Sequence, residues 1–142
     1  MSVRSAQAEW QGDLPKGKGT IRTETGSFSG QYSFSSRFEE GTGTNPEELI
    51  AAAHAGCFSM ALSNILAGAG HTPTSVKTTA RVHLNKVEGA PAINLIELVC
   101  RAVVPGLDEA TFLEHAGKAK VGCPVSKALS AVDIKLDAAL EG

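Results

Sequence analysis

The sequence has few aromatic residues and no concentration of charge of either sign. Among its 142 residues, Trp and Tyr occur once each and Phe five times, so small aliphatic side chains must build most of any core. The formal net charge is -2, and the longest basic cluster is Lys16-Gly17-Lys18. Because polyanions bind basic patches, neither nucleic acid nor an anionic membrane is an expected partner.

The sequence also lacks the marks of secretion and of nucleotide binding. Its N-terminus has no apolar run and no small-residue cleavage pattern, so we expect a cytoplasmic protein without a signal peptide. No glycine-rich turn joins an expected strand to a helix, which leaves nucleotide binding without support. Three cysteines in such a chain do not indicate a disulfide framework, and thiols of this kind are inert, metal-bound or reactive. The length favours a single domain over residues 1–142.

One long stretch, residues 49–70, contains no Asp, Glu, Lys or Arg. Its length reaches the roughly 20 residues that a membrane span needs, but Ala, Gly and Ser are abundant and neither Trp nor Tyr flanks it. We therefore expect no membrane span. A helix that is uncharged on every side is instead expected to be buried on all faces. In so small a chain, a second subunit must cover part of it, which predicts a homodimer.

The pattern of short strands and two helical blocks predicts an α+β fold with mainly antiparallel sheets, joined by hairpins rather than crossovers. Asn45 as N-cap and Pro46 at the first helical position predict a helix from Pro46 to Ala69. A second helix over residues 107–120 and a short one that starts at Cys123-Pro124 follow. Strands are expected over residues 6–11, 20–25, 32–38, 76–84, 96–104 and 132–138.

Cys57 lies in the middle of the first predicted helix, where a thiol is poorly activated. The helix dipole acts only on the first turn, and apolar burial raises a thiol pKa, so a Cys57 nucleophile needs a nearby cation. Arg37 is the candidate, since it could favour the thiolate and also stabilise the oxygen that leaves when a thiolate splits a peroxide bond. Glu47 or Glu48 could hold the guanidinium. Glu47 and Cys57 are about 15 Å apart along one helix, so either Arg37 bridges them or they come from different subunits.

Cys123 is placed at a predicted helix start, where unpaired backbone N–H groups lower a thiol pKa. This position suits a resolving thiol, which attacks a sulfenic acid on Cys57 and leaves a disulfide for an external reductant. Cys100 takes an inward position of a strand and is expected in the core.

Two other interpretations remain open at this point. His54 lies three residues before Cys57, and with Cys123 the pair could offer three ligands to zinc, so a zinc-binding protein is one alternative. A non-catalytic protein that binds an apolar ligand, with incidental cysteines, is the other.

Two segments resemble the OsmC/Ohr family of thiol peroxidases: residues 45–62, NPEELIAAAHAGCFSMAL, and residues 121–129, VGCPVSKAL. The likeness extends over nearly the whole chain, and the early segments WQGD, GKGT and SRFE place it nearer the OsmC branch. The resemblance implies curved antiparallel sheets around a long central helix, in an intertwined homodimer with two interface sites and no metal or cofactor. It implies a thiol-dependent peroxidase that reduces organic hydroperoxides to alcohols and is recycled by a dithiol reductant such as a lipoyl protein.

The resemblance also assigns roles residue by residue. The peroxidatic cysteine falls on Cys57, the resolving cysteine on Cys123, the helix-head glutamate on Glu47 and the OsmC-branch arginine on Arg37. The implied cycle passes through a Cys57 sulfenic acid and a Cys57–Cys123 disulfide. Gly56 departs from the family pattern, in which Ala is usual, but this change removes no chemical group.

Overall fold

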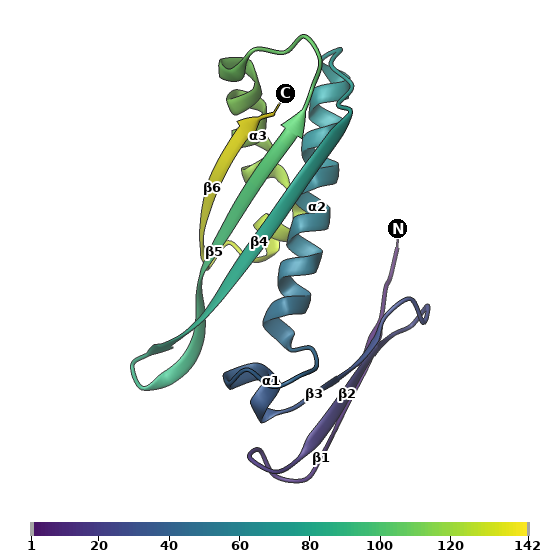
Figure 1. Cartoon of the computed structure of the whole chain (residues 1–142), viewed down its shortest axis with the longest axis vertical. Helices are drawn as coiled ribbons and strands as arrows, with labels where there is room; N and C mark the ends of the chain where they lie inside the picture. The colour runs from purple at the N-terminus through teal and green to yellow at the C-terminus, as the bar shows by residue number, and fades with distance from the viewer. Residues whose placement is uncertain (1, 142) are drawn as a thin grey trace. The chain divides into compact units, whose positions relative to one another are not determined.

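The computed structural model describes residues 2–141, which form two three-stranded sheets and four helices (Figure 1). Residues up to Leu49 make one compact unit, and residues from Ile50 make the other. Along the chain, the elements are β1 (Ala6–Gln11), β2 (Lys18–Thr23), β3 (Ser29–Tyr32), α1 (Phe34–Phe38), α2 (Pro46–Gly68), β4 (Ser75–Val87), β5 (Ala90–Val103), α3 (Glu109–Gly122), α4 (Pro124–Ala128) and β6 (Asp133–Leu140). The predicted α+β class with mainly antiparallel sheets is confirmed.

The first unit is built on the antiparallel meander β1-β2-β3. Its register places Gly19 between Trp10 and Tyr32 on neighbouring strands. Because Gly19 has no side chain, the two aromatic rings meet across it, with their centroids 5.3 Å apart. A Cβ atom at Gly19 would collide with both rings. The single Trp and the single Tyr of the chain therefore pack together on one face of this sheet.

The segment after β3 corrects one sequence prediction. A strand was expected over residues 32–38, but residues 34–38 form the short helix α1. Its start is fixed by a capping box in which the Ser36 N–H donates to Ser33 Oγ (3.1 Å) and the Ser33 N–H donates to Ser36 Oγ (2.8 Å). The Ser36 hydroxyl also donates to the Thr44 carbonyl (2.7 Å). The alternation of apolar and polar residues fits a strand, but the two serines satisfy a helix start instead.

The second unit contains a sheet in the order β4-β5-β6. The β4–β5 hairpin turns on Glu88 and Gly89, which both have positive φ, as two-residue hairpin turns of the primed type require. In contrast to the expected hairpin connections, β6 pairs parallel to β5. Parallel neighbours need a long crossover, and α3 with α4 provides it.

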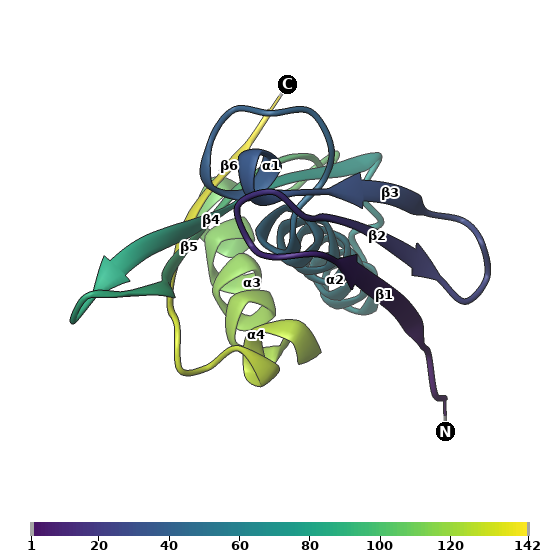
Figure 2. The same ribbon diagram turned by 90° about the horizontal axis from the view of Figure 1, so that it is seen from below.

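The helices of the second unit lie on one face of this sheet, as both views show (Figures 1 and 2). Cys100 is fully buried in the core, which confirms the prediction made from its place in the strand pattern. The largest fully buried apolar side chains of the core come from α2, β5 and α3: Phe58, Leu62, Leu66, Ile96, Leu98 and Phe112. This core holds α2 and α3 against the strand that carries Cys100.

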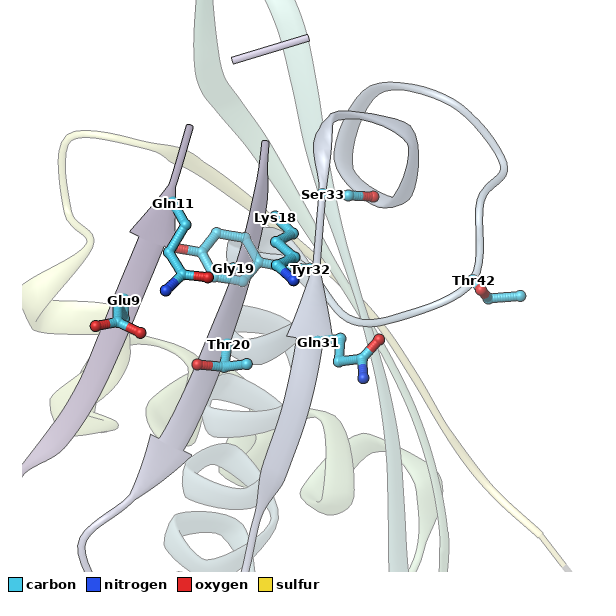
Figure 3. Close-up of a pocket in the computed structure, with 9 residues that line it drawn as sticks. All are labelled: Glu9, Gln11, Lys18, Gly19, Thr20, Gln31, Tyr32, Ser33 and Thr42. Carbon is cyan, nitrogen blue, oxygen red and sulfur yellow. The ribbon is translucent and has the colours of Figure 1, made fainter. Parts of the chain in front are cut away.

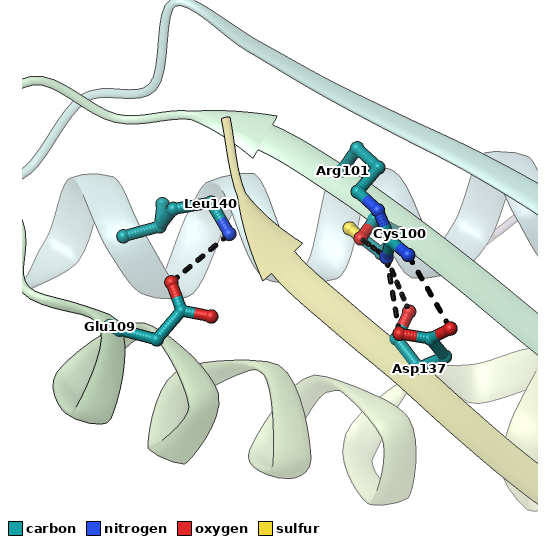
Figure 4. Close-up of polar contacts among 5 residues, drawn as sticks. All are labelled: Cys100, Arg101, Glu109, Asp137 and Leu140. Atoms are coloured by element: carbon teal, nitrogen blue, oxygen red, sulfur yellow. Dashed lines mark hydrogen bonds and ion pairs between the residues drawn. The ribbon is translucent and has the colours of Figure 1, made fainter. Parts of the chain in front are cut away.

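Polar contacts fasten β6 to its neighbours (Figure 4). The Arg101 guanidinium on β5 donates to both carboxylate oxygens of Asp137 on β6, at 3.2 and 3.4 Å. The Glu109 carboxylate, in the first turn of α3, accepts from the Leu140 N–H near the end of β6 (3.2 Å). These contacts thus tie β6 to its neighbour β5 and to the first turn of the crossover helix α3.

Helix α2 begins at Pro46, as predicted, and the Asn45 side chain caps it by accepting from the Glu48 N–H (2.8 Å). The helix is long and apolar enough to cross a membrane by length and composition. Within the chain, the residues of α2 without any exposed surface form a stripe four residues apart: His54, Phe58, Leu62 and Leu66. Met60, on another side, is 76% exposed. The sequence prediction of burial on all faces is therefore not met within one chain.

Candidate active site

The structure brings together the two cysteines that the sequence singles out. Cys57 lies on α2 and Cys123 is the N-cap residue of α4, yet their Sγ atoms are 2.8 Å apart. Both thiols are free. Cys123 is fully buried, whereas Cys57 is partly exposed, so an external oxidant reaches Cys57 first.

The two thiols differ in acidity. Burial raises the pKa of the Cys57 thiol, the contact with Cys123 raises it further, and the Val125 N–H offsets only part of this effect. Burial also raises the pKa of Cys123, but hydrogen bonding with Cys57, with the Ser126 backbone and side chain and with the Val125 backbone outweighs it and brings this pKa below its usual value. In the contacting pair, Cys123 is therefore the thiol that ionises more readily.

This asymmetry agrees with the sequence prediction that Cys57 is poorly activated by its helix. Groups in the first turn of α4 lower the pKa of Cys123, which is the direction that its position before Pro124 led us to expect. Cys57 gains no such support from the thiol beside it. A Cys57 nucleophile thus requires a positive charge.

The first unit contains the predicted arginine and its carboxylate partner. The Arg37 Nε and Nη2 atoms donate to the two carboxylate oxygens of Glu47, at 3.1 and 2.9 Å. Glu47 is only 7% exposed. The adjacent Glu48 carboxylate accepts from the Thr44 hydroxyl (3.0 Å), so Glu47, not Glu48, holds the guanidinium. This two-pronged geometry fixes the plane of the Arg37 side chain.

A polar contact beside the thiol pair was missed at the level of sequence. The Nε2 atom of His54 lies 2.7 Å from the Ser126 hydroxyl oxygen, and both residues are buried. Ser126 could have been found from its position three residues after Cys123 at a helix start, since residues at that spacing share a face. His54 thus hydrogen-bonds Ser126. Within residues 2–141, no three His, Cys, Asp or Glu side chains gather as a metal site, which leaves the zinc alternative without a ligand set.

The cavity on the sheet of the first unit gives little support to the alternative of an apolar-ligand protein. One cavity of about 460 Å³ lies on the sheet of the first unit (Figure 3). Its side chains are mainly polar and come from all three strands and the segments that follow β3: Glu9, Gln11, Lys18, Thr20, Gln31, Tyr32, Ser33 and Thr42. Such a lining does not favour a greasy ligand.

An α+β fold that holds two free thiols in contact is typical of thiol-dependent redox proteins. The chain belongs to the OsmC-like protein family, whose model matches residues 39–137. Peroxiredoxin OsmC of Escherichia coli (strain K12) is 55% identical to it over 135 residues, which cover 94% of each chain.

Two further comparisons extend the similarity. The organic hydroperoxide resistance protein of Xanthomonas axonopodis pv. citri (strain 306) is 37% identical over 89 residues, covering 62% of this chain and 61% of that protein. A crystal structure of an organic hydroperoxide resistance protein OsmC from Legionella pneumophila matches with a TM-score of 0.75 and 25% identity, covering 98% of this chain and 99% of the other. These findings confirm the family resemblance and the fold that it implies.

Proposed function

We propose that this thiol-dependent peroxidase reduces organic hydroperoxides to alcohols, with Cys57 as the nucleophile and Cys123 as the resolving thiol. The observation that carries the proposal is the contact of two free thiols across 2.8 Å. The names of two relatives, peroxiredoxin and organic hydroperoxide resistance protein, support the same class of reaction and substrate.

The proposed cycle has three steps. The Cys57 thiolate attacks one oxygen of the hydroperoxide, the O–O bond breaks, and the alkoxide leaves and takes up a proton to become the alcohol. The Cys123 thiolate then attacks the Cys57 sulfenic acid, the disulfide forms, and hydroxide leaves and is protonated to water. An external dithiol, for which a lipoyl protein is our candidate, supplies the two electrons that restore both thiols.

Arg37 is the proposed source of the positive charge that Cys57 needs. A guanidinium beside the sulfur would favour the thiolate form of Cys57 and would also stabilise the departing alkoxide. The first step of the cycle needs both effects. Glu47 would hold the Arg37 plane through the two hydrogen bonds of 3.1 and 2.9 Å.

The proposed assembly is a homodimer in the cytoplasm. After its first turn, helix α2 has no charged residue, and it exposes apolar surface that a single chain does not cover, with Met60 76% exposed. We propose that a second copy, and not lipid, covers this surface. We further propose that both compact units act as one domain, which the family match over residues 39–137 supports because it includes parts of each unit.

The decisive experiment treats the reduced protein with one equivalent of cumene hydroperoxide under anaerobic conditions. Two of the three thiols should disappear, and peptide mapping by mass spectrometry should find Cys57 linked to Cys123 while Cys100 stays reduced. In Cys123→Ser, only the Cys57 thiol should disappear, and a sulfenic acid probe should label it. Unchanged thiols, or a link that includes Cys100, would overturn the proposal.

A further inference from the structure

The two cysteines belong to a pair of matched helical faces. His54 and Cys57 are three residues apart on α2, and Cys123 and Ser126 are three residues apart at the start of α4. Residues at this spacing lie on one face of a helix. The two faces meet at two points: the Sγ atoms of Cys57 and Cys123 are 2.8 Å apart, and His54 Nε2 and Ser126 Oγ are 2.7 Å apart. Each thiol therefore has a polar neighbour one turn along its own helix.

Burial makes the polar contact costly unless it is well satisfied. His54 has no exposed surface, and Ser126 is 5% exposed. An apolar pair of similar size would fill this space without removing a hydroxyl and an imidazole from water. The pair therefore places an imidazole and a hydroxyl beside the two thiols at a desolvation cost that apolar side chains would avoid.

The partners of the two His54 ring nitrogens indicate which residue donates in the contact between His54 and Ser126. His54 Nδ1 is buried and has no partner among the described residues. Burial lowers the pKa of His54, so the ring is neutral and carries one proton. If that proton were on Nδ1, the structure would contain a buried donor without an acceptor, which proteins avoid more strictly than an unpaired acceptor. The proton is therefore on Nε2, which donates to Ser126 Oγ.

This tautomer leaves the Ser126 hydroxyl hydrogen free for another acceptor. Ser126 accepts from His54 through its oxygen and can donate through its single hydrogen. Ser126 lies three residues after Cys123 in the first turn of α4, so its hydroxyl and the Cys123 sulfur are on the same face of the helix. Hydrogen bonding with Ser126 lowers the pKa of Cys123. Two further groups influence Cys123. The Cys57 thiol on α2 contacts it, and the Val125 backbone of α4 lowers its pKa.

We infer that His54 orients the Ser126 hydroxyl toward Cys123 Sγ, and that both are positioning residues for the resolving thiolate. The inference rests on the proposed function for its place in catalysis, because the Cys123 thiolate is the attacking group of the second step. A hydroxyl aimed at the sulfur stabilises the thiolate, and His54 prevents the hydroxyl from turning away. Neither residue gains or loses a proton in the step.

The test measures Cys123 in a Cys57→Ala background, where no peroxide chemistry occurs. Thiolate absorbance at 240 nm is followed against pH under reducing conditions. Ser126→Ala should raise the Cys123 pKa by about one unit, which is the effect of losing a hydrogen bond to a charged group. His54→Gln keeps an N–H near the position of Nε2 and should leave the pKa near the parent value. His54→Asn places its N–H near the position of Nδ1 instead and should raise the pKa.

A double-mutant comparison separates positioning from general stability. His54→Asn should have no further effect on the Cys123 pKa once Ser126 is Ala, because its route of action is gone. An unchanged pKa in Ser126→Ala, or a full His54→Asn effect that persists without Ser126, would overturn the inference. The melting temperature of each variant shows whether folding is intact. Because this titration needs no peroxide, its result is independent of whether the proposed peroxidase activity is found.

With Cys57 present, stopped-flow kinetics should place the same residues in the second step. Ser126→Ala should slow disulfide formation after cumene hydroperoxide is added, at pH values below the raised Cys123 pKa. The consumption of peroxide by Cys57 in a single turnover should change less than twofold. Slower peroxide consumption with normal disulfide formation contradicts the assignment to the resolving thiol.

Discussion

The Sγ atoms of Cys57 and Cys123 are 2.8 Å apart, and the contact shifts their acidities in opposite directions. The hydrogen bond between the two thiols lowers the pKa of Cys123, and it raises that of Cys57 after the larger effect of burial. Cys123, the proposed resolving thiol, is thus the more readily ionised of the two while both thiols are reduced. Cys57, the proposed nucleophile, depends on help from outside this pair.

Removing the resolving thiol should therefore make Cys57 more acidic. In Cys123→Ala, the thiol that raises the Cys57 pKa is absent, so the pH at which a single turnover reaches half its maximal rate should fall. Rapid-mixing measurements of peroxide consumption between pH 5 and 9 would show the shift. Cys100→Ala is the matched control, since Cys100 is buried in the core, and its profile should coincide with the parent. A profile that moves to higher pH in Cys123→Ala would contradict this account of the pair.

The carboxylate that holds Arg37 should matter for activity, whereas its neighbour should not. Glu47→Gln keeps the size of the side chain but loses the charge that binds the guanidinium at two points. We expect the second-order rate constant with cumene hydroperoxide to fall by about 10²-fold, the size of effect seen when one charge-stabilising contact is lost from a transition state.

Glu48→Gln is the control for this comparison, because Glu48 lies one residue further along α2 and accepts from Thr44 instead. Its rate constant should stay within about threefold of the parent. Equal losses in the two variants would show that the rate constant depends on the acidic start of the helix and not on the contact with Arg37. Thermal unfolding of both proteins would confirm that the comparison is between folded enzymes.

The sequence was sufficient for α2 and for the thiols, but not for α1, β6 or Ser126. Asn45 and Pro46 fix a helix start through local chemistry alone, and the structure agrees to the residue. The segment that forms α1 has two competing local patterns, a strand-like alternation and a helix start at Ser33. The reciprocal Ser33–Ser36 hydrogen bonds favour the helix. The parallel pairing of β6 is a tertiary choice that no alternation of side chains reveals.

The same distinction applies to the site. Cys57 and Cys123 could be paired from their contrasting local settings, and Glu47 could be distinguished from Glu48 only by the family resemblance. The only signal for Ser126 is its position three residues after Cys123, and this signal is weak because a serine in a helix start is common. Its contact with His54 exists only because α2 and α4 meet, and the two residues are 72 positions apart in sequence. Contacts across elements of this kind are what sequence patterns cannot supply.

Gly56 should be replaceable by Ala with a gain in stability. Gly56 lies within α2, and a Cβ atom there would meet no heavy atom within 4 Å. Ala is favoured over Gly in a helix interior by about 1 kcal/mol, so Gly56→Ala should raise the free energy of unfolding by 0.5 to about 1 kcal/mol. Urea denaturation at a fixed protein concentration measures it. Gly19→Ala, which would collide with Trp10 and Tyr32, should destabilise. Loss of stability in Gly56→Ala would reveal an occupant of that space outside the chain.

A charge on the exposed side of α2 should disrupt the proposed homodimer. Met60 is 76% exposed in one chain, and Met60→Glu would place a carboxylate on the surface that a second copy is proposed to cover. Sedimentation velocity should show the parent as a dimer and the variant shifted toward monomer. Val3→Glu alters a residue that is 86% exposed outside α2, and it should leave the dimer intact. A parent protein that sediments as a monomer would remove the dimer from the proposal.

The core thiol Cys100 should make the fold less stable at alkaline pH. Burial raises its pKa, and hydrogen bonding with Thr78 offsets this only in part, so the folded state favours the protonated thiol. A group whose pKa is higher in the folded state stabilises the fold fully below its unfolded pKa, about 8.5, and this contribution is lost as pH rises toward the folded value. The free energy of unfolding should therefore decline above pH 8.5 by up to about 1.4 kcal/mol per pH unit from this residue.

Cys100→Ala should be less stable than the parent at pH 7, because it leaves a small cavity, but the gap between the two proteins should narrow as pH increases. Urea titrations at several pH values between 7 and 10, with reductant present, measure that gap, and a gap that stays constant would show that Cys100 does not ionise on unfolding as described.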